Sequence, residues 1–233
     1  MSALAQDDGA GVRAAIVDLD GTMVDTVGDF DVALNAMLAD LALPAIDRAF
    51  ITQTVGKGSE YLIRRVLEAI GADAARYDDA WAGYQAHYRR INGRHSEIYP
   101  GVREGLEQLR DRGWKLACLT NKPGVFAREL LDAKGLAGFF EVVNGGDAFA
   151  RKKPDPLPLL KTCEALATDP AQTLMIGDSS NDARAARAAG CPVWLVSYGY
   201  NHGEPVADVD CDGIVDRLDQ LPRLVTSRAQ RPA

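Results

Sequence analysis

Two aspartates near the start of the chain have the spacing and the surroundings of catalytic carboxylates. Asp18 and Asp20 are separated by a single residue, follow the apolar run Ala14–Val17, and precede Gly21 and Thr22. A short apolar run predicts a buried strand, and open α/β sheets bind ligands beyond the carboxyl ends of their strands. Asp and Gly are also turn formers, so this stretch alone is equally compatible with a simple turn after a strand.

The chemistry that such a pair supports is phosphoryl transfer assisted by a divalent cation. Neighbouring carboxylates repel each other, and a bound cation removes that penalty. Mg²⁺ prefers hard oxygen ligands and is usually held by one or two carboxylates together with substrate phosphate. Beside Mg²⁺, Asp18 can stay ionised as a nucleophile, while Asp20 can carry a proton as general acid and base.

Polar side chains also follow three segments farther along the chain: Thr120 and Asn121, Lys153, and Asp178 with Asp182. Because parallel strands bring their carboxyl ends to one edge of a sheet, we expect these side chains to meet the aspartate pair. Thr120 and Lys153 would then bind phosphoryl oxygens, and Asp178 would complete the metal site. Taken singly, each has an ordinary explanation as a strand former, a solvated lysine or a helix cap. The ordered set is far more specific than any member.

The order of the predicted elements indicates an α/β core that is interrupted by a helical segment. Residues 25–96 show only helical patterns, whereas strands alternate with helices from residue 97 onwards. Such alternation predicts a parallel sheet with right-handed crossovers. The predicted fold is therefore a Rossmann-like parallel sheet core, residues 1–24 and 97–233, with an inserted α-helical cap domain at 25–96. The strands are predicted at residues 14–17, 115–120, 139–143, 173–176 and 192–196.

Composition and charge narrow the class of protein. The chain has 233 residues, 47% of them hydrophobic, and a formal net charge of −7. The negative charge argues against a nucleic-acid or anionic-membrane partner, and no apolar stretch approaches the ~20 residues of a transmembrane helix. Residues 1–11 show no signal segment and no cysteines form a Cys-x-x-Cys pair, so we expect reduced thiols and a cytoplasmic location. Whether the protein is a monomer or a homodimer stays open.

Four short motifs, spread over about residues 14 to 200, together resemble those of the haloacid dehalogenase superfamily phosphatases. They are Asp-Leu-Asp-Gly-Thr at 18–22, Leu-Thr-Asn-Lys at 119–122, Lys-Pro at 153–154 and Gly-Asp-Ser-Ser-Asn-Asp at 177–182. Further segments are similar to bacterial phosphoglycolate phosphatases, namely those at 55–58, 99–101, 121–123 and 198–200. The resemblance implies Mg²⁺-dependent hydrolysis of a small phosphorylated metabolite, 2-phosphoglycolate, to glycolate and phosphate.

The resemblance also implies a different role for each of the acidic residues. Asp18 would become an aspartyl-phosphate, and Asp20 would protonate the leaving oxygen and then activate water. The metal ligands would be Asp18, the backbone carbonyl of Asp20, and Asp178, with Asp182 as a further candidate. Thr26 stands where the family more often has serine, a departure that leaves the chemistry intact.

The remaining site residues are implied to bind the substrate. Thr120 and Lys153 would hold the phosphate, and we also place Gly21, Thr22 and Asn121 at substrate-binding positions. Caps of this kind close over the site and exclude water. Lys57, between Gly56 and Gly58, is our candidate for reading the substrate's carboxylate, against the alternative of a plain solvent-facing lysine in a turn.

Other activities compete with this interpretation. A broader sugar-phosphate or small-metabolite phosphatase would use the same residues, and a mutase could use the same phospho-aspartate. A dehalogenase is disfavoured because carbon–halogen displacement does not need the acid, base and metal position that Asp20 supplies. A receiver-type signalling module is disfavoured because its phosphorylated aspartate lies on a later strand than its acidic pair, and because it needs no helical cap.

Overall fold

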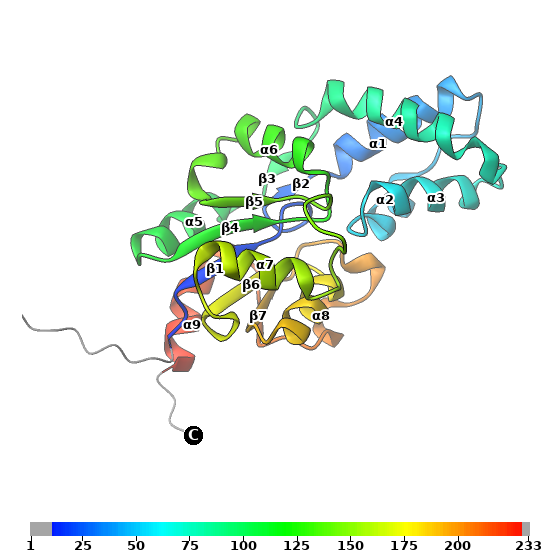
Figure 1. Cartoon of the computed structure of the whole chain (residues 1–233). Coiled ribbons are helices and arrows are strands. Elements are labelled where there is room, and N and C mark those ends of the chain that lie inside the picture. Colours follow the sequence, from blue (N-terminus) through cyan, green and yellow to red (C-terminus); the bar gives the residue numbers. More distant parts are fainter. Residues whose placement is uncertain (1–10, 230–233) are drawn as a thin grey trace, which may run out of the picture.

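The structure is a computed structural model, and it describes residues 11–229 of the chain. Residues 1–10, which contain most of the region where no signal segment was expected, lie outside that range. The main sheet is parallel and six-stranded, in the order β5-β4-β1-β6-β7-β8 (Figure 1). From edge to edge the strands are Val142–Asn144, Lys115–Leu119, Ala14–Val17, Thr173–Gly177, Val193–Val196 and Gly213–Val215.

The central strand β1 determines where the site forms. Its four residues are fully buried, and Val17 at its end pairs with Cys118 of β4 and Ile176 of β6. Because the three strands are parallel and end at nearly the same level, the residues that follow them emerge at one edge of the sheet. Asp18 follows β1 directly at this edge.

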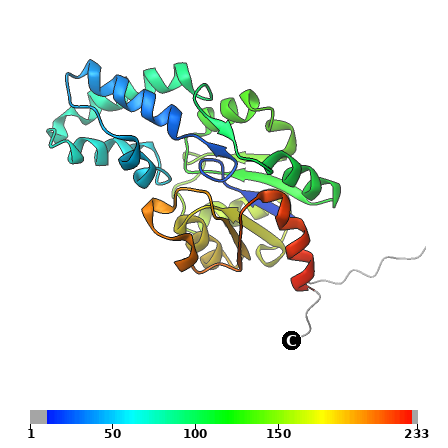
Figure 2. The same cartoon turned by 180° about the vertical axis from the view of Figure 1, so that it is seen from behind.

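Helices cover both faces of the sheet, and the strand residues alternate between the two (Figures 1 and 2). Ala15 and Val17 pack with α5, α6 and α9, whereas Ala14 and Ile16 pack with α7 and α8. This period of two is the pleat of a strand that is buried on both faces. The covering helices are α5 Val102–Asp111, α6 Gly124–Ala133, α7 Leu157–Leu166, α8 Ser180–Ala189 and α9 Leu221–Ala229.

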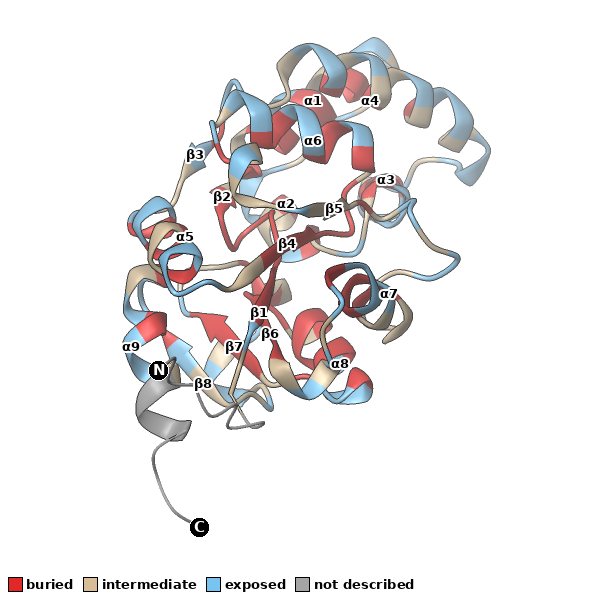
Figure 3. Cartoon of the chain, turned by 60° about the vertical axis from the view of Figure 1, so that its left-hand side comes forward, coloured by how far each residue is buried: buried red, intermediate tan, exposed pale blue. Residues whose placement is uncertain are grey.

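Residues 27–91 form a helical unit at the end of the sheet where the site lies (Figure 1). Its helices are α1 Val27–Asp40, α2 Arg48–Thr54, α3 Ser59–Ala69 and α4 Tyr77–Ile91. They share a hydrophobic cluster of their own, which Phe126 of α6 and Tyr200 join from the core. Figure 3 shows the buried inner surfaces of α1 and α4 against exposed outer surfaces. A segment with its own core can move as a body on its connections.

The two connections to this unit lie side by side. Strand β2, Val24–Asp25, pairs antiparallel with β3, Glu97–Ile98, in a two-stranded ribbon. The ribbon coincides with the predicted junctions at 24/25 and 96/97, and the division of the chain into core and cap stays a prediction. Short 3-10 helices complete the chain at Ala74–Arg76, Ala137–Phe139, Pro170–Gln172, Asn201–Gly203, Val206–Asp208 and Leu218–Gln220.

The predicted fold class is confirmed, with local differences in the strands, among them the β2–β3 ribbon. The strand expected at 139–143 begins at Val142, because Ala137–Phe139 forms a 3-10 helix before it. Strand β8 at the sheet edge was not expected, and it is three residues long. Among residues 11–229, no helix has the length and the apolar character needed to cross a membrane.

Candidate active site

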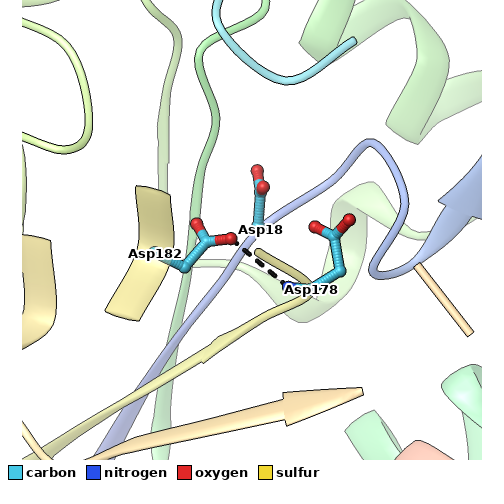
Figure 4. Close-up of side chains that lie close together, drawn as sticks. All are labelled: Asp18, Asp178 and Asp182. Atoms are coloured by element: carbon cyan, nitrogen blue, oxygen red, sulfur yellow. Dashed lines mark hydrogen bonds between the residues drawn. The ribbon is translucent and has the colours of Figure 1, made fainter. Parts of the chain in front are cut away.

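Three buried aspartates lie together at the edge where β1 and β6 end (Figure 4). One carboxylate oxygen from each of Asp18, Asp178 and Asp182 lies within 4.8 Å of the others. Asp18 follows β1, Asp178 follows β6, and Asp182 lies in the first turn of α8. The structure thus brings Asp18 together with two residues that are 160 and 164 positions away in the chain, because parallel strands end at one edge of the sheet.

Lys153 joins two of these carboxylates. Its ammonium nitrogen lies 3.0 Å from Asp18 Oδ1 and 2.7 Å from Asp182 Oδ1, and it donates to the carbonyl of Leu119 at 2.8 Å. The lysine side chain is only 2% exposed. Burial alone would lower the pKa of Lys153, but the charges of the two aspartates raise it above the ordinary value. Lys153 is therefore held as a fixed positive charge beside Asp18.

Asp182 has both oxygens engaged by protein groups. Besides Lys153, it accepts hydrogen bonds from the Ser179 hydroxyl at 2.9 Å and from the backbone N–H groups of Ser179 and Asp178 at 3.2 and 3.3 Å. Figure 4 shows its carboxylate directed at the backbone of Asp178. These contacts indicate that Asp182 positions the Lys153 ammonium and the loop after β6.

Asp178 is held from both sides. The hydroxyl of Thr22 donates to its Oδ1 at 3.1 Å, and the backbone N–H of Tyr200 donates to its Oδ2 at 2.8 Å. Gly21, at a φ of 84°, and Gly199 pass so close that a Cβ on either would meet an oxygen of this carboxylate, at 2.4 Å and 2.6 Å. Both positions thus require glycine to make room for Asp178.

The negative charges of these buried carboxylates are unfavourable at neutral pH. Burial raises the pKa of Asp18 to about 7, against the opposing charge of Lys153. Burial, followed by the charges of Asp182 and Asp18, raises the pKa of Asp178 well above its ordinary value. Each of these aspartates therefore favours a bound proton or cation over an uncompensated charge.

The donor set fits a hard divalent cation. Asp18, Asp178 and Asp182 carry three negative charges when ionised, and Lys153 is the cation that pairs with two of them. Two negative charges thus stay uncompensated in a buried cluster, and a dication with oxygen ligands neutralises them. What the structure establishes is this buried acidic cluster.

Asp20 lies in a different environment from Asp18. Its Oδ1 accepts hydrogen bonds from the Thr26 hydroxyl at 2.8 Å and from the Lys122 ammonium at 2.9 Å. The ammonium lies 4.6 Å from the ring centroid of Phe30 and 4.9 Å from that of Tyr88, which belong to α1 and α4. The two aspartates therefore have separate lysines, and their environments differ as two different roles require.

The residues at the end of β4 link several parts of the site. Thr120 is buried, and its hydroxyl accepts a hydrogen bond from the backbone N–H of Lys122 at 3.2 Å. Asn121 donates to the carbonyls of Gly56 and Lys153, both at 2.9 Å, and accepts from the Lys153 N–H at 3.0 Å. Asn121 therefore connects the Lys153 loop to the helical unit of residues 27–91.

A small pocket of about 20 Å³, room for about one water, lies between the edge of the main sheet and the helical unit of residues 27–91. Its walls combine residues that follow strands of the main sheet with residues of the helical unit. The first are Asp18, Asp20, Thr120, Asn121 and Lys122, and the second are Phe30, Val55, Gly56, Gly58, Ser59 and Leu62. Lys57 does not line it, although both of its neighbours do, and its ammonium lies 5.2 Å from the ring centroid of Tyr61. The assignment of Lys57 to the substrate carboxylate stays a prediction.

Two residues of the site were given no role in the sequence analysis. Lys122 lies within the 119–122 motif. Lysines are common in the loops that follow strands, so the residue type alone does not indicate a buried role in the site. Tyr200 contacts Asp178 through its backbone and the start of α1 through its hydroxyl, which accepts from the Thr26 N–H at 2.8 Å. No spacing in the sequence points to that contact, which joins residues 174 positions apart.

Comparison with known proteins identifies the class. A family model described as haloacid dehalogenase-like hydrolase matches residues 15–196, and the four motif segments all fall within that range. The chain therefore belongs to the haloacid dehalogenase-like hydrolases, and the resemblance seen in the motifs is confirmed.

Within that family, the chain is similar to phosphoglycolate phosphatases along nearly its whole length. The phosphoglycolate phosphatase of Thiobacillus denitrificans is 42% identical over 218 residues, covering 92% of this chain and 96% of that protein. A plasmid phosphoglycolate phosphatase of Cupriavidus necator is 46% identical over 222 residues, covering 94% and 96%. The protein is an enzyme, a phosphatase of this family.

Solved structures agree with this placement. The crystal structure of a predicted phosphoglycolate phosphatase from Haemophilus somnus has a TM-score of 0.88 and 30% identity, over 91% of this chain and 97% of that one. The structure of CbbY from Rhodobacter sphaeroides in complex with phosphate, at 23% identity and a TM-score of 0.78 over 90% and 96% of the two chains, shares the fold.

Proposed function

We propose that the protein hydrolyses 2-phosphoglycolate to glycolate and phosphate through an aspartyl-phosphate on Asp18. One observation carries the proposal: Asp18, paired with Lys153 at 3.0 Å and clustered with Asp178, shares a core–cap pocket with Asp20. This arrangement is the phosphoryl-transfer set expected of the family, and relatives that cover over nine-tenths of the chain are phosphoglycolate phosphatases. We therefore assign to this protein the substrate that the names of these relatives give, 2-phosphoglycolate.

We infer that the cation is Mg²⁺, held by Asp18, Asp178 and the backbone carbonyl of Asp20. Asp182 remains a candidate ligand, although its contacts with Lys153 and Ser179 favour a positioning role. When bound, Mg²⁺ offsets the charge of the phosphoryl group and of the carboxylates around it. The buried cluster of uncompensated carboxylates supports this assignment.

In the first half-reaction, a carboxylate oxygen of Asp18 forms a bond to phosphorus. The bond between phosphorus and the glycolate oxygen breaks, and that oxygen takes a proton from Asp20. Glycolate therefore leaves with a neutral hydroxyl group in place of the ester oxygen. Lys153 and Thr120 stabilise the charge on the phosphoryl oxygens. Asp20 is suited to this task because it lines the pocket together with Asp18, and the Thr26 hydroxyl and the Lys122 ammonium hold its carboxylate in place.

In the second half-reaction, Asp20, now ionised, removes a proton from a water molecule. The water oxygen bonds to phosphorus, the bond from phosphorus to Asp18 breaks, and phosphate leaves while Asp20 is protonated again. Asp20 thus acts first as acid and then as base. Asn121 lines the pocket, whereas the Thr22 hydroxyl donates to Asp178 and Gly21 leaves room for that carboxylate. We keep all three as substrate-binding positions.

We propose that residues 25–96 act as a cap that closes over the substrate. In the structure Gly56 accepts hydrogen bonds from Asn121 and Asn181 at 2.9 and 3.3 Å, and Lys152 pairs with Glu60 at 2.7 Å. These contacts hold the cap against the core and leave room for about one water. A two-carbon phosphate ester needs more room, so substrate entry requires the cap to move on the β2–β3 ribbon.

The location and the assembly of the protein are also proposals. All four cysteines are free, and Cys118, Cys163 and Cys191 are buried. Reduced thiols are typical of the cytoplasm, where a phosphorylated metabolite would also be found. We therefore place a monomer or homodimer in the cytoplasm, with a small metabolite rather than nucleic acid or membrane as its partner.

A substrate panel tests the proposed function. With Mg²⁺ present, kcat/KM for 2-phosphoglycolate is expected to exceed that for sugar phosphates and other small phosphomonoesters by at least about tenfold. The measurement is phosphate release at matched substrate concentrations. A flat profile would instead establish a broad phosphatase, and an isomerised phosphate ester as product would establish a mutase.

A further inference from the structure

Lys122 occupies an unusual place between core and cap. Its side chain is only 2% exposed, and its ammonium lies 2.9 Å from Asp20 Oδ1. The aromatic rings of Phe30 and Tyr88, both from the cap, stand over the same nitrogen at 4.6 and 4.9 Å from their centroids. A buried lysine is costly unless its charge is compensated, so a site that retains one has a use for it.

Within the described residues, Lys122 is the cation that lines the core–cap pocket. The pocket wall also carries Asp18 and Asp20, whereas Lys153 and Lys57 are not among its lining residues. An ammonium group has three N–H donors. One of them serves Asp20, and the two aromatic rings stabilise the charge through their faces without acting as ordinary hydrogen-bond acceptors. Lys122 therefore has donor capacity for an anion that enters the pocket.

The position of Asp20 shows where such an anion would lie. Asp20 gives its proton to the leaving oxygen, so that oxygen must be within hydrogen-bond reach of its carboxylate. In 2-phosphoglycolate the carboxylate carbon is only two covalent bonds beyond the leaving oxygen. A cation that contacts Asp20 directly, as Lys122 does, is thus within reach of the substrate's carboxylate.

We propose that Lys122 binds the carboxylate of 2-phosphoglycolate and thereby selects short phosphate esters with a carboxylate next to the ester carbon. This inference rests on the proposed function. Because Phe30 and Tyr88 belong to the cap, the subsite is complete only when the cap lies on the core. Carboxylate recognition and closure of the site are therefore one event, and the substrate's own charge stabilises the closed form.

Lys57 is the competing candidate, and it provides a matched control. Its ammonium lies over the Tyr61 ring rather than in the pocket wall. The variants Lys122→Met and Lys57→Met each remove one ammonium from a lysine near an aromatic ring of the cap, and methionine keeps most of the apolar volume. The readout is the selectivity ratio, which is kcat/KM for 2-phosphoglycolate divided by kcat/KM for ethyl phosphate, the two-carbon ester without a carboxylate.

The expected result is a fall of about 10- to 100-fold in the selectivity ratio for Lys122→Met, mostly through KM for 2-phosphoglycolate, because a charge-assisted contact is lost. Lys57→Met is expected to keep the wild-type ratio. Lys122→Arg, which keeps the charge, is expected to retain most of the selectivity, and thermal unfolding checks that each variant folds. Lys122→Gln replaces the methionine variant if that one does not fold.

Equal losses on both esters in Lys122→Met would overturn the inference, since they would assign Lys122 only to the positioning of Asp20. Loss of the ratio in Lys57→Met with retention in Lys122→Met would overturn it in favour of Lys57. A wild-type enzyme with no preference for 2-phosphoglycolate over ethyl phosphate would instead contradict the proposed function, a failure that shows before any variant is made.

Discussion

Replacement of Asp18 by asparagine is expected to lower turnover of 2-phosphoglycolate by more than about 10⁴-fold, because the amide cannot accept the phosphoryl group. Asparagine has nearly the same shape and keeps an oxygen for the Leu19 N–H, which donates to Asp18 at 2.7 Å. Its neutral side chain also relieves the charge repulsion in a cluster where burial raises the pKa of Asp18 to about 7. The metal-free variant is therefore expected to be at least as stable as the wild type at pH 7.5.

Phosphate release and thermal unfolding measure the two effects separately. Asp111→Asn is a matched control, because the Asp111 side chain is 72% exposed and lies at the end of α5, which leads into the start of β4 and not into the strand ends that carry the site. The control should keep full activity. Retention of more than a few per cent of the activity in Asp18→Asn would show that the covalent route is wrong.

Removal of the metal by EDTA is expected to abolish turnover reversibly, and to lower the midpoint of thermal unfolding more at pH 7.5 than at pH 5.5. Without a cation, burial keeps the pKa values of Asp18 and Asp178 above those of the unfolded chain. The folded protein then binds more protons than the unfolded one, so its stability falls as the pH rises from about 4 to 7. Mg²⁺ replaces these protons, and its stabilising effect is largest where they are lost.

Unfolding curves with Mg²⁺ and with EDTA at the two pH values give the measurement. Restored activity on addition of excess Mg²⁺ shows that the loss is reversible. A stabilisation by Mg²⁺ that is equal at both pH values, or absent at both, would contradict a metal held by these two carboxylates.

The sequence predicts the main part of the site because its residues sit at the ends of strands. Asp18, Thr120 and Asp178 each follow an apolar run, and parallel strands leave little freedom in where such residues emerge. The roles of these residues stay predictions, but their proximity follows from the topology. For the same reason the fold class could be assigned from the alternation of strands and helices.

Contacts made across the molecule could not be predicted in this way. Lys122 is 102 positions from Asp20, and its place under Phe30 and Tyr88 depends on how α1 and α4 pack against the rest of the protein. Tyr200 connects Asp178 to the start of α1 through a loop whose shape no local pattern determines. Such contacts depend on tertiary packing rather than on strand ends.

Local errors in the predicted strands have a similar cause. The apolar residues from Phe139 to Val143 suit a strand, but the chain turns through a 3-10 helix before it can pair with β4 at Ala117. Strand β8 has only three residues and pairs at the sheet edge with β7, so its strand character comes from its partner more than from its own sequence.

Membership of the haloacid dehalogenase-like hydrolases also decides between the competing activities considered for the sequence. It excludes the receiver-type signalling module, whose acidic pair and phosphorylated aspartate lie on different strands. The relatives are phosphatases, which favours hydrolysis over phosphoryl transfer within a sugar.

The most direct test of the account is to look for the phosphoryl group on Asp18. Wild-type enzyme is mixed with Mg²⁺ and 2-phosphoglycolate that carries radiolabelled phosphorus, and the reaction is quenched with acid before one turnover is complete. We predict a protein-bound label that hydroxylamine releases, that maps to the peptide containing Asp18, and that is missing from Asp18→Asn. Phosphate released in that first turnover with no label on the protein, or a label that persists in Asp18→Asn, would contradict the account.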